Sequence, residues 1–236
     1  MGKWLKIWLI VLGSIVVVWW VWAWLTKIWT IPNWFNIDVL CPNVYEFNFS
    51  SEVKKPIIYL YPTTQTQVNV FLWNTESLSH TYPKYNLSKW RNIIAQPNGD
   101  LKDIETWRKL YALYREWKTR NETDFDEWFV VEWKDVISFL EEKLAILWLN
   151  EREAEEFIVY WLPQMENNKY NLIKFETFEE QNENMPLSIT PTPDTVIRVM
   201  MDRKAINESI DIPEQRLTTP ERNWFTVVEW WGSPRN

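Results

Sequence analysis

The chain opens with a long apolar segment and then changes to short runs in which apolar and polar residues alternate. Residues 7–26 contain no charged side chain, and a helix of that length spans about 30 Å, the thickness of the hydrocarbon core of a membrane. The segment is apolar on every face, unlike an amphipathic core helix. We therefore predict a transmembrane anchor within residues 1–27.

Flanking charge predicts the orientation of this helix. Lys3 and Lys6 precede the apolar segment together with the amino terminus, whereas only Lys27 follows before Asp38. Because cytoplasmic flanks carry the excess of Lys and Arg, we expect a cytoplasmic N-terminus and an extracytoplasmic main domain, in a single-pass protein of the cell membrane. A cleaved signal peptide is the alternative, which depends on the identity of the Trp residues between 19 and 24.

Residues 28–54, with scattered Pro and Asn, are interpreted as a linker. Residues 55–236 then show the short runs typical of strands in a mainly antiparallel sheet. A type I′ hairpin is predicted at Asn98-Gly99, and a second hairpin turn at Trp73-Asn74. The predicted strand runs are PIIYLYP, TQVNVFLW, SLSHTY, WRNIIAQ, KLYALYRE, FVVE, NLIKFET, LSITP, TVIRVMMD and FTVVEW.

Two helices interrupt the strand pattern. Asp135 is the expected cap of the first, which carries an apolar stripe over residues 136–147. Asn150 is the expected cap of the second, with Glu153 completing a capping box and Pro163 ending the apolar periodicity. The predicted fold is α+β, a sheet domain with a helical hairpin packed on one face, preceded by one N-terminal transmembrane helix.

Trp148 stands directly after the first predicted helix, where the backbone usually becomes left-handed and Gly is preferred. The chain has 19 Trp and 4 Gly, whereas about 7% Gly, roughly 17 residues, is ordinary for this length. We hypothesise that many printed Trp are glycines encoded by UGA under an alternative genetic code. The alternative is a Trp-rich domain whose aromatics stack on sugars or lipid headgroups.

Five Trp residues occupy turn or helix-end positions: Trp73, Trp117, Trp133, Trp148 and Trp224. Glycine is the expected residue at such positions, because aromatic residues favour strand interiors. We therefore expect these five side chains to be exposed or their backbone to be strained. Well-packed indoles there would argue against recoding.

Four stretches, at residues 55–62, 81–86, 141–175 and 223–233, resemble an uncharacterised family of bacterial, often membrane-anchored proteins marked by a K-P-x-I-Y-L-Y-P signature. The resemblance covers roughly residues 54–233. It implies no activity. It does imply Gly at the positions of Trp128, Trp133, Trp148, Trp224 and Trp231, and genuine Trp at Trp161 and Trp230.

Charge and metal-binding residue types narrow the possible partners. Three of the 25 basic residues precede residue 35, so the remainder holds 22 basic and 32 acidic side chains, a net charge of −10. This balance argues against a nucleic-acid partner. With one cysteine, Cys41, and one histidine, His80, the chain lacks a disulfide framework and a zinc-ligand cluster. We expect no cofactor or metal, and a packed thiol at Cys41.

Catalytic motifs are absent from the sequence, so carboxylates are the remaining candidates. Glu116, Glu132, Glu166 and Glu229 lie beside aromatic residues at the ends of predicted elements, where an acid and a base can be paired. Solvated faces and cap positions are the alternative explanation for these side chains. His80, in an alternating run, is expected on a strand or at its rim.

A polar turn after the second helix offers a candidate binding site. Amide and aromatic groups there suit a sugar or a peptide, or simply close the helix. The residues are Tyr160, Trp161, Gln164, Glu166, Asn168 and Tyr170. Because no catalytic set can be named, we predict a membrane-tethered extracytoplasmic binding or envelope-structural module with an envelope glycan or protein partner. The alternative is an extracytoplasmic carboxylate-dependent hydrolase of glycan or peptide.

Overall fold

A computed structural model describes residues 51–52, 54–73, 78–85, 90–119 and 126–235, all within one compact unit, Asn48–Asn236. The predicted transmembrane segment, most of the linker and Cys41 lie outside the described residues. Among the helices that are described, none combines the length and the apolar character needed to cross a bilayer.

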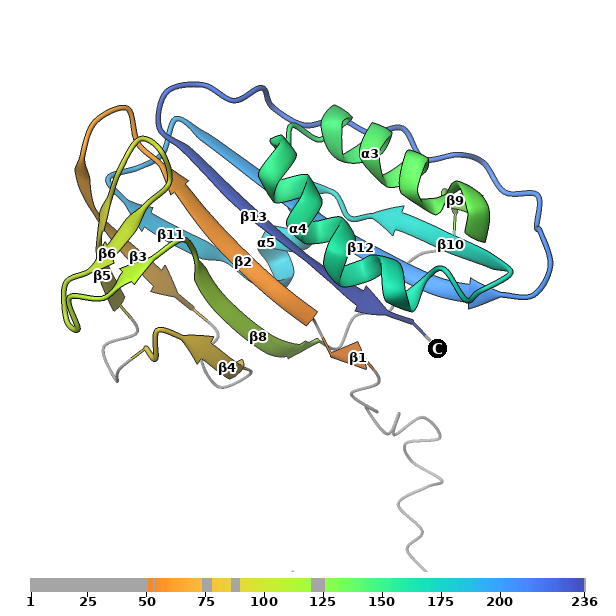
Figure 1. Cartoon of the computed structure of the whole chain (residues 1–236), viewed down its shortest axis with the longest axis horizontal. Coiled ribbons are helices and arrows are strands. Elements are labelled where there is room, and N and C mark those ends of the chain that lie inside the picture. The colour runs from red at the N-terminus through yellow and green to blue at the C-terminus, as the bar shows by residue number, and fades with distance from the viewer. Residues whose placement is uncertain (1–50, 53, 74–77, 86–89, 120–125, 236) are drawn as a thin grey trace, which may run out of the picture. The chain divides into compact units, whose positions relative to one another are not determined.

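The domain is α+β, as predicted, but it contains two sheets instead of one (Figure 1). The large sheet has the strand order β1-β8-β2-β13-β12-β10-β9, with β4 also paired to β8, and the small sheet has the order β11-β3-β5-β6-β7. The strands are β1 (Ser51–Glu52), β2 (Lys54–Tyr61), β3 (Thr66–Leu72), β4 (Leu78–Tyr82), β5 (Trp90–Ala95), β6 (Leu101–Asp103), β7 (Lys109–Leu110), β8 (Leu113–Thr119), β9 (Phe129–Glu132), β10 (Tyr170–Phe175), β11 (Leu187–Thr190), β12 (Thr195–Ile206) and β13 (Thr226–Pro234).

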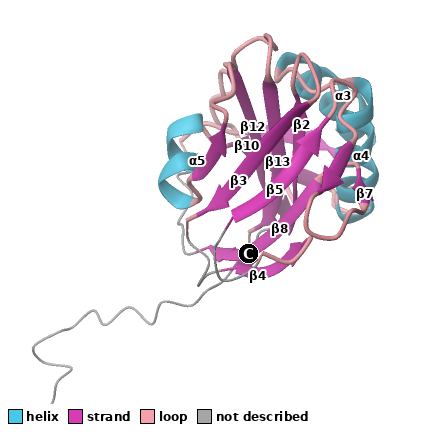
Figure 2. Cartoon of the chain, turned by 90° about the vertical axis from the view of Figure 1, so that its left-hand side faces the viewer, coloured by secondary structure: helices cyan, strands magenta, loops and turns pink. Residues whose placement is uncertain are grey.

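The helices cover both faces of the large sheet (Figure 2). They are α3 (Val136–Ile146), α4 (Glu151–Trp161) and α5 (Phe178–Asn184), with 3-10 turns η2 (Trp133–Asp135) and η3 (Leu162–Gln164). The hairpin of α3 and α4 packs on one face, and α5 and the small sheet lie on the other. The predicted helical hairpin is therefore present, and the second sheet is the element that the sequence pattern did not reveal.

The central strands are apolar along their whole length because both of their faces are covered. In β13, Val228 and Trp230 belong to the core under α3 and α4, whereas Val227 belongs to the core between the sheets. Strands buried on two sides read as continuous apolar runs, which explains the sequence TVVEWW. β13 pairs antiparallel with β2 and parallel with β12; every other strand pair described is antiparallel.

The junction between α3 and α4 has the hydrogen bonds of a Schellman motif. Leu149 N donates to Leu144 O at 3.1 Å, and Trp148 N donates to Ala145 O at 3.0 Å. Trp148 has φ +61°, the left-handed conformation that this motif requires of the residue after the C-cap. The predicted Gly-type helix stop is therefore real, although its residue is printed as Trp.

The predicted caps meet different outcomes. Asn150 Oδ1 accepts from Glu153 N at 2.9 Å and Asn150 N donates to Glu153 Oε2 at 2.8 Å, which confirms the capping box of α4. Asp135 occupies the N-cap position of α3, but its side chain makes no cap hydrogen bond. Its backbone is already helical, φ −101° and ψ −1°, because the 3-10 turn η2 precedes α3 directly.

The exposed Trp residues agree only in part with the recoding hypothesis. Trp73, Trp133, Trp148 and Trp224 are 53, 54, 40 and 78% exposed, and Trp224 also has a left-handed backbone with φ +48°. Trp117 is 3% exposed and packs edge-on against Trp231, so its predicted exposure is wrong.

Other Trp residues also separate into exposed and buried ones. Trp107 is 62% exposed at φ +58°, which the sequence pattern did not predict. Trp128 and Trp231, for which the resemblance implies Gly, are buried, as are Trp161 and Trp230, for which it implies Trp.

Two turn predictions need correction. The β5–β6 hairpin forms, but Gly99 N donates to Gln96 O at 2.9 Å and Pro97 is the first central residue. Because the Pro97 ring fixes a negative φ, the turn cannot be type I′, and only Gly99, at φ +87°, is left-handed. The hairpin predicted at Trp73-Asn74 is wrong, since β3 and β4 belong to different sheets.

Candidate functional site

A groove lined by two lysines and three tyrosines is the first candidate site. Strands β2, β4, β7 and β8, together with the β5–β6 turn, enclose a pocket of about 580 Å³, which we call the tyrosine groove. It is lined by Lys55, Ile57, Tyr82, Asp100, Lys109, Leu110, Tyr111, Ala112, Leu113 and Tyr114. Its shape follows from the register, because Tyr82 pairs with Tyr114 and Tyr114 pairs with Ile57 across neighbouring strands.

Tyrosine rings continue from the groove along β2. Tyr59 and Tyr61 stack with their centroids 6.3 Å apart, and Tyr111 lies 6.5 Å from Tyr59. The Tyr59 hydroxyl donates to Glu156 Oε2 at 2.8 Å, which ties the sheet to α4. Burial, reinforced by the Glu156 carboxylate, raises the pKa of Tyr59, so this phenol stays protonated.

Lys55 is held in an unusual position at the end of the groove. Its backbone has φ +51°, and its N–H donates to Glu116 Oε1 at 3.2 Å. The ammonium Nζ lies 5.0 Å from the centre of the Tyr160 ring and 5.6 Å from that of Trp230. A strained backbone held by a hydrogen bond and two aromatic contacts is typical of a functional position.

Glu116, a predicted catalytic candidate, lies next to this lysine. His80 Nδ1 is 3.4 Å from Glu116 Oε2, and the two side chains are 71 and 22% exposed. Burial and the Glu116 carboxylate raise the pKa of Tyr114 and of Tyr160. The fold thus brings together Glu116 and Tyr160, which the sequence placed in separate candidate sets, and puts His80 on strand β4, as predicted.

Glu229 has a different environment, inside a buried ion cluster. Arg115 Nε donates to its Oε1 at 2.7 Å, and Arg198 Nε donates to its Oε2 at 2.9 Å. All three side chains are buried, and this burial lowers the pKa of Arg198. Both carboxylate oxygens are therefore occupied, as expected for a structural ion pair.

The four candidate glutamates have different partners. Glu132 pairs with Lys134 Nζ at 2.8 Å, and Glu166 is exposed in the turn after α4. Within the described part of the chain, no hydrogen bond or ion pair joins any two of Glu116, Glu132, Glu166 and Glu229. Their catalytic role stays a prediction.

The amides of the predicted binding turn are used within the fold. Gln164 Nε2 donates to Tyr160 O at 3.2 Å, and its Oε1 accepts from Arg203 at 3.1 Å. Asn168 Nδ2 donates to Gln164 O at 3.1 Å and to Asn171 Oδ1 at 2.7 Å. These hydrogen bonds close the C-terminal end of α4. The amides therefore fit the alternative given above for this turn, in which they simply close the helix.

The aromatic residues of the same set separate. Trp161 is buried under the sheet, where Phe157 lies 6.3 Å from its ring. Tyr170 is half-buried at the start of β10, with the Lys169 ammonium 5.8 Å from its ring. Among the six predicted residues, Tyr160 is the one whose ring meets Lys55 at the tyrosine groove.

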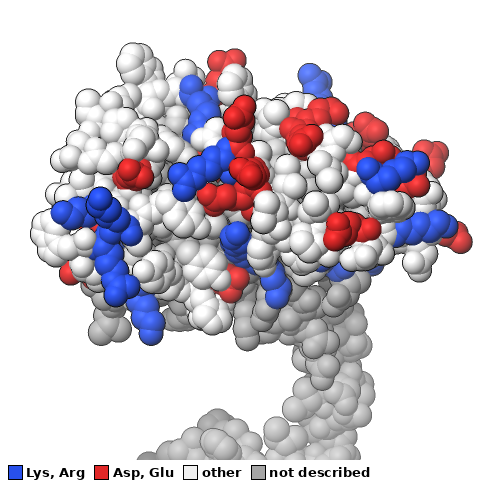
Figure 3. All heavy atoms as spheres, viewed as in Figure 1, with Lys and Arg blue, Asp and Glu red and all other residues white. Residues whose placement is uncertain are grey.

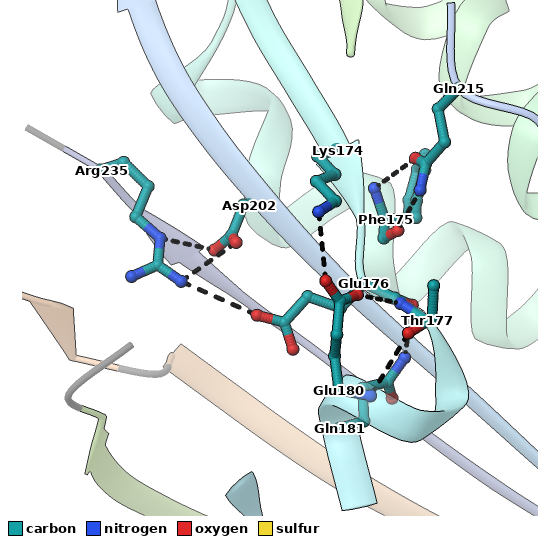
Figure 4. A network of polar contacts seen from close by, with 9 residues as sticks. All are labelled: Lys174, Phe175, Glu176, Thr177, Glu180, Gln181, Asp202, Gln215 and Arg235. Atoms are coloured by element: carbon teal, nitrogen blue, oxygen red, sulfur yellow. Dashed lines mark hydrogen bonds and ion pairs between the residues drawn. The ribbon is translucent and has the colours of Figure 1, made fainter. Parts of the chain in front are cut away.

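A carboxylate network that sequence reasoning missed lies where β10, β12 and β13 meet α5 (Figure 4). Arg235 Nε and Nη2 donate to Asp202 at 2.8 and 3.0 Å, and Nη2 lies 3.7 Å from Glu176 Oε1. Lys174 pairs with Glu180 at 3.2 Å. Burial and the Asp202 carboxylate raise the pKa of Glu176 to about 8.

A second pocket, of about 590 Å³, lies between the segment around Glu176 and the connection from β12 to β13. Gln215 fixes the connection, because its amide accepts from Phe175 N at 2.9 Å and donates to Phe175 O at 2.5 Å. The pocket is lined mainly by residues 175–179, 193–196 and 215–220. Among the described residues, no group of three or more His, Cys, Asp or Glu side chains is placed to hold a metal ion.

Comparison with known proteins adds no relative. No protein-family model matches the chain, and neither a curated protein nor a solved structure does. The resemblance to proteins with the K-P-x-I-Y-L-Y-P signature therefore stays a prediction.

Proposed function

We propose that this protein is a membrane-tethered, extracytoplasmic binding module whose tyrosine groove takes up an envelope glycan. The observation that carries the proposal is the groove itself, a pocket of about 580 Å³ with Tyr82 and Tyr111 49 and 46% exposed. Aromatic faces beside a few convergent polar groups are typical of ligand sites. The tethering and its orientation rest on residues 7–26 and their flanking lysines.

A binding experiment with groove variants tests this proposal. The full-length chain in detergent is titrated calorimetrically with oligosaccharides, and Tyr82→Ala and Tyr111→Ala are compared with the parent protein. Loss of a stacking ring is expected to weaken binding about tenfold or more in each variant. Trp133→Ala is the matched control, because Trp133 is 54% exposed but starts the turn before α3, outside the groove. Undiminished binding by both groove variants contradicts the proposal.

The location has its own test. Alkaline phosphatase fused after residue 236 is expected to be active in intact cells, since that enzyme needs an oxidising compartment for its disulfides. A fusion placed directly after Lys6, before the apolar segment, is expected to be inactive. An inactive fusion after residue 236, in cells that contain the full-length fusion protein, contradicts the predicted orientation.

A second candidate function is the hydrolase, favoured by the contact between His80 and Glu116. A carboxylate at His Nδ1 orients the imidazole and leaves Nε2 free to act as a general base. If the groove hydrolyses a glycan or peptide, Glu116→Gln is expected to lower kcat by about 100-fold or more, while ligand binding persists. Unchanged turnover in Glu116→Gln excludes this mechanism.

A further inference from the structure

We infer that the tyrosine groove is selective for an acidic glycan, a sugar polymer that carries carboxylate or phosphate groups, with Lys55 as its principal cation. This inference rests on the proposed binding function of the groove. It adds the chemical class of the ligand, and it is argued from the cations that line the pocket.

Lys55 offers a partly desolvated charge that no described carboxylate neutralises. Its side chain is half-buried, and Nζ faces the rings of Tyr160 and Trp230 at 5.0 and 5.6 Å. Among the described side chains, no carboxylate forms an ion pair with Nζ; the nearby Glu116 accepts from the Lys55 backbone and faces His80. A cation removed from water is stabilised by an anion, and a ligand anion supplies the missing partner.

Further cations lie at the rim of the groove, where they are exposed. Lys109 lines the groove, and Lys102 and Arg108 lie beside it on the β6–β7 hairpin. Within the described residues these three cations have no carboxylate partner: Lys102 Nζ lies 4.3 Å from the Trp107 ring, and Arg108 Nη1 is 3.5 Å from the Tyr82 hydroxyl.

Elsewhere on the same face the charges are mixed. Figure 3 shows Lys and Arg gathered at the left-hand end, over the small sheet, while most Asp and Glu on this face lie over α3 and α4. Asp100, the acid that lines the groove, accepts from Asn98 Nδ2 at 2.9 Å and is thereby engaged in its own turn. The groove is therefore locally basic on a domain whose net charge is acidic, which favours an anionic ligand.

The floor of the groove favours a sugar over an extended peptide. β8 is paired with β2 on one edge and with β4 on the other, so its backbone groups are used within the sheet. A peptide that binds by strand addition needs a free edge. Tyrosine rings with hydroxyl groups at their tips instead suit the flat apolar faces and the hydroxyls of a pyranose.

The inference is tested by titrating the full-length protein in detergent with four probes. These are an alginate oligosaccharide, a glycerol-phosphate teichoic acid, a neutral cello-oligosaccharide of matched length and poly-glutamate. One or both acidic glycans are expected to bind about tenfold more tightly than the neutral one, with an affinity that falls as salt is added. Which acidic glycan binds identifies the anionic group.

Variants assign the effect to the named cations. Lys55→Met removes the charge and keeps most of the length of the side chain, and Lys109→Gln does the same at the rim. Each is expected to weaken acidic-glycan binding about tenfold and to remove most of the preference for the acidic over the neutral glycan. Lys134→Gln, an exposed lysine paired with Glu132 beyond the groove, is the control and is expected to have no effect.

The outcomes separate the inference from the function on which it rests. Equal affinity for neutral and acidic glycans, lost in Tyr111→Ala, overturns the acidic selectivity and leaves the binding function standing. Poly-glutamate bound as tightly as alginate overturns the sugar specificity. Failure of every glycan to bind overturns both proposals.

Discussion

At the scale of single residues, the backbone divides the tryptophans into two groups. Trp107, Trp148 and Trp224 have left-handed φ values of +58°, +61° and +48°, and all three are exposed. An L-residue pays about 1 kcal/mol or more for that conformation, whereas Gly does not. The buried tryptophans give no such reason to be Gly, so the recoding hypothesis is tested first at these three positions.

Replacement of Trp148 distinguishes a position that requires Gly from one that suits a genuine Trp. Trp148→Gly is expected to have a free energy of unfolding about 1 kcal/mol higher than Trp148→Ala, measured in urea, because only Gly adopts the left-handed backbone of the Schellman motif without strain. At Trp133, whose φ is not left-handed, Ala is expected to be at least as stable as Gly. If Ala equals Gly at position 148, the strain argument fails. Tandem mass spectrometry of the natively expressed protein then identifies the residue directly.

Glu229 illustrates how sequence proximity to aromatics can mislead. Its neighbours in the chain are apolar, but the fold surrounds it with Arg115 and Arg198. Glu229→Gln leaves two buried arginines without a counterion and is expected to cost about 3 to 5 kcal/mol of unfolding free energy, measured in urea. Glu132→Gln, at the surface, is expected to cost less than about 1 kcal/mol. If Glu229→Gln lowers the free energy of unfolding by less than about 1 kcal/mol, the structural role of Glu229 is contradicted.

At the scale of elements, one arginine fastens the connection between β12 and β13. Arg222 donates to Glu153 Oε2 at 2.7 Å and Oε1 at 3.2 Å, and to Trp148 O at 3.1 Å. The connection, residues 207–225, has no helix or strand of its own. The junction between α3 and α4 therefore contains the capping box and also anchors the connection between β12 and β13.

Arg222→Ala is expected to free this connection. Glu153 is buried, and removing its partner leaves the carboxylate without compensation, at a cost of about 2 kcal/mol or more. Amide hydrogen exchange in residues 207–224 is expected to accelerate as well. Arg152→Ala, which removes an exposed i,i+4 pair with Glu156, is the control for the loss of an arginine. Unaltered exchange in the loop would show that Arg222 is not needed to hold it, since Gln215 and Thr195 also bond to this connection.

At the scale of the whole molecule, the sequence predicts elements better than it predicts their assembly. The strand runs, the helical hairpin and the Asn150 cap are local patterns, and local periodicity reveals them. The division into two sheets depends on which strands pair, as the separation of β3 from β4 shows. The Glu176–Asp202 network also depends on pairing, because residues 26 positions apart meet only through the β10–β12 register. The one local sign is a charged residue closing an apolar run, as in VMMD.

That network makes stability depend on pH. Burial and the Asp202 carboxylate raise the pKa of Glu176 from its ordinary value of 4.5 to about 8, so the folded protein holds this proton more tightly. Its contribution to stability is full below pH 4.5 and is lost as pH rises towards about 8. The urea midpoint of the parent protein is expected to fall over this range, and Glu176→Gln is expected to fall less. Glu179→Gln, exposed and neighbouring, is the control; parallel curves for all three proteins contradict the assignment.

The position of β13 has a consequence for synthesis. It comes last among the described strands in chain order, yet it separates β2 from β12 in the middle of the large sheet. Any nascent chain that ends before Thr226 therefore exposes two unpaired strand edges at once, a surface prone to aggregation. If codon 224 is UGA, a host that reads UGA as stop releases such a chain at this codon or an earlier one. For a chain that ends at codon 224 itself, with glycine codons at the earlier positions, a separate peptide with the sequence of β13 is expected to restore solubility.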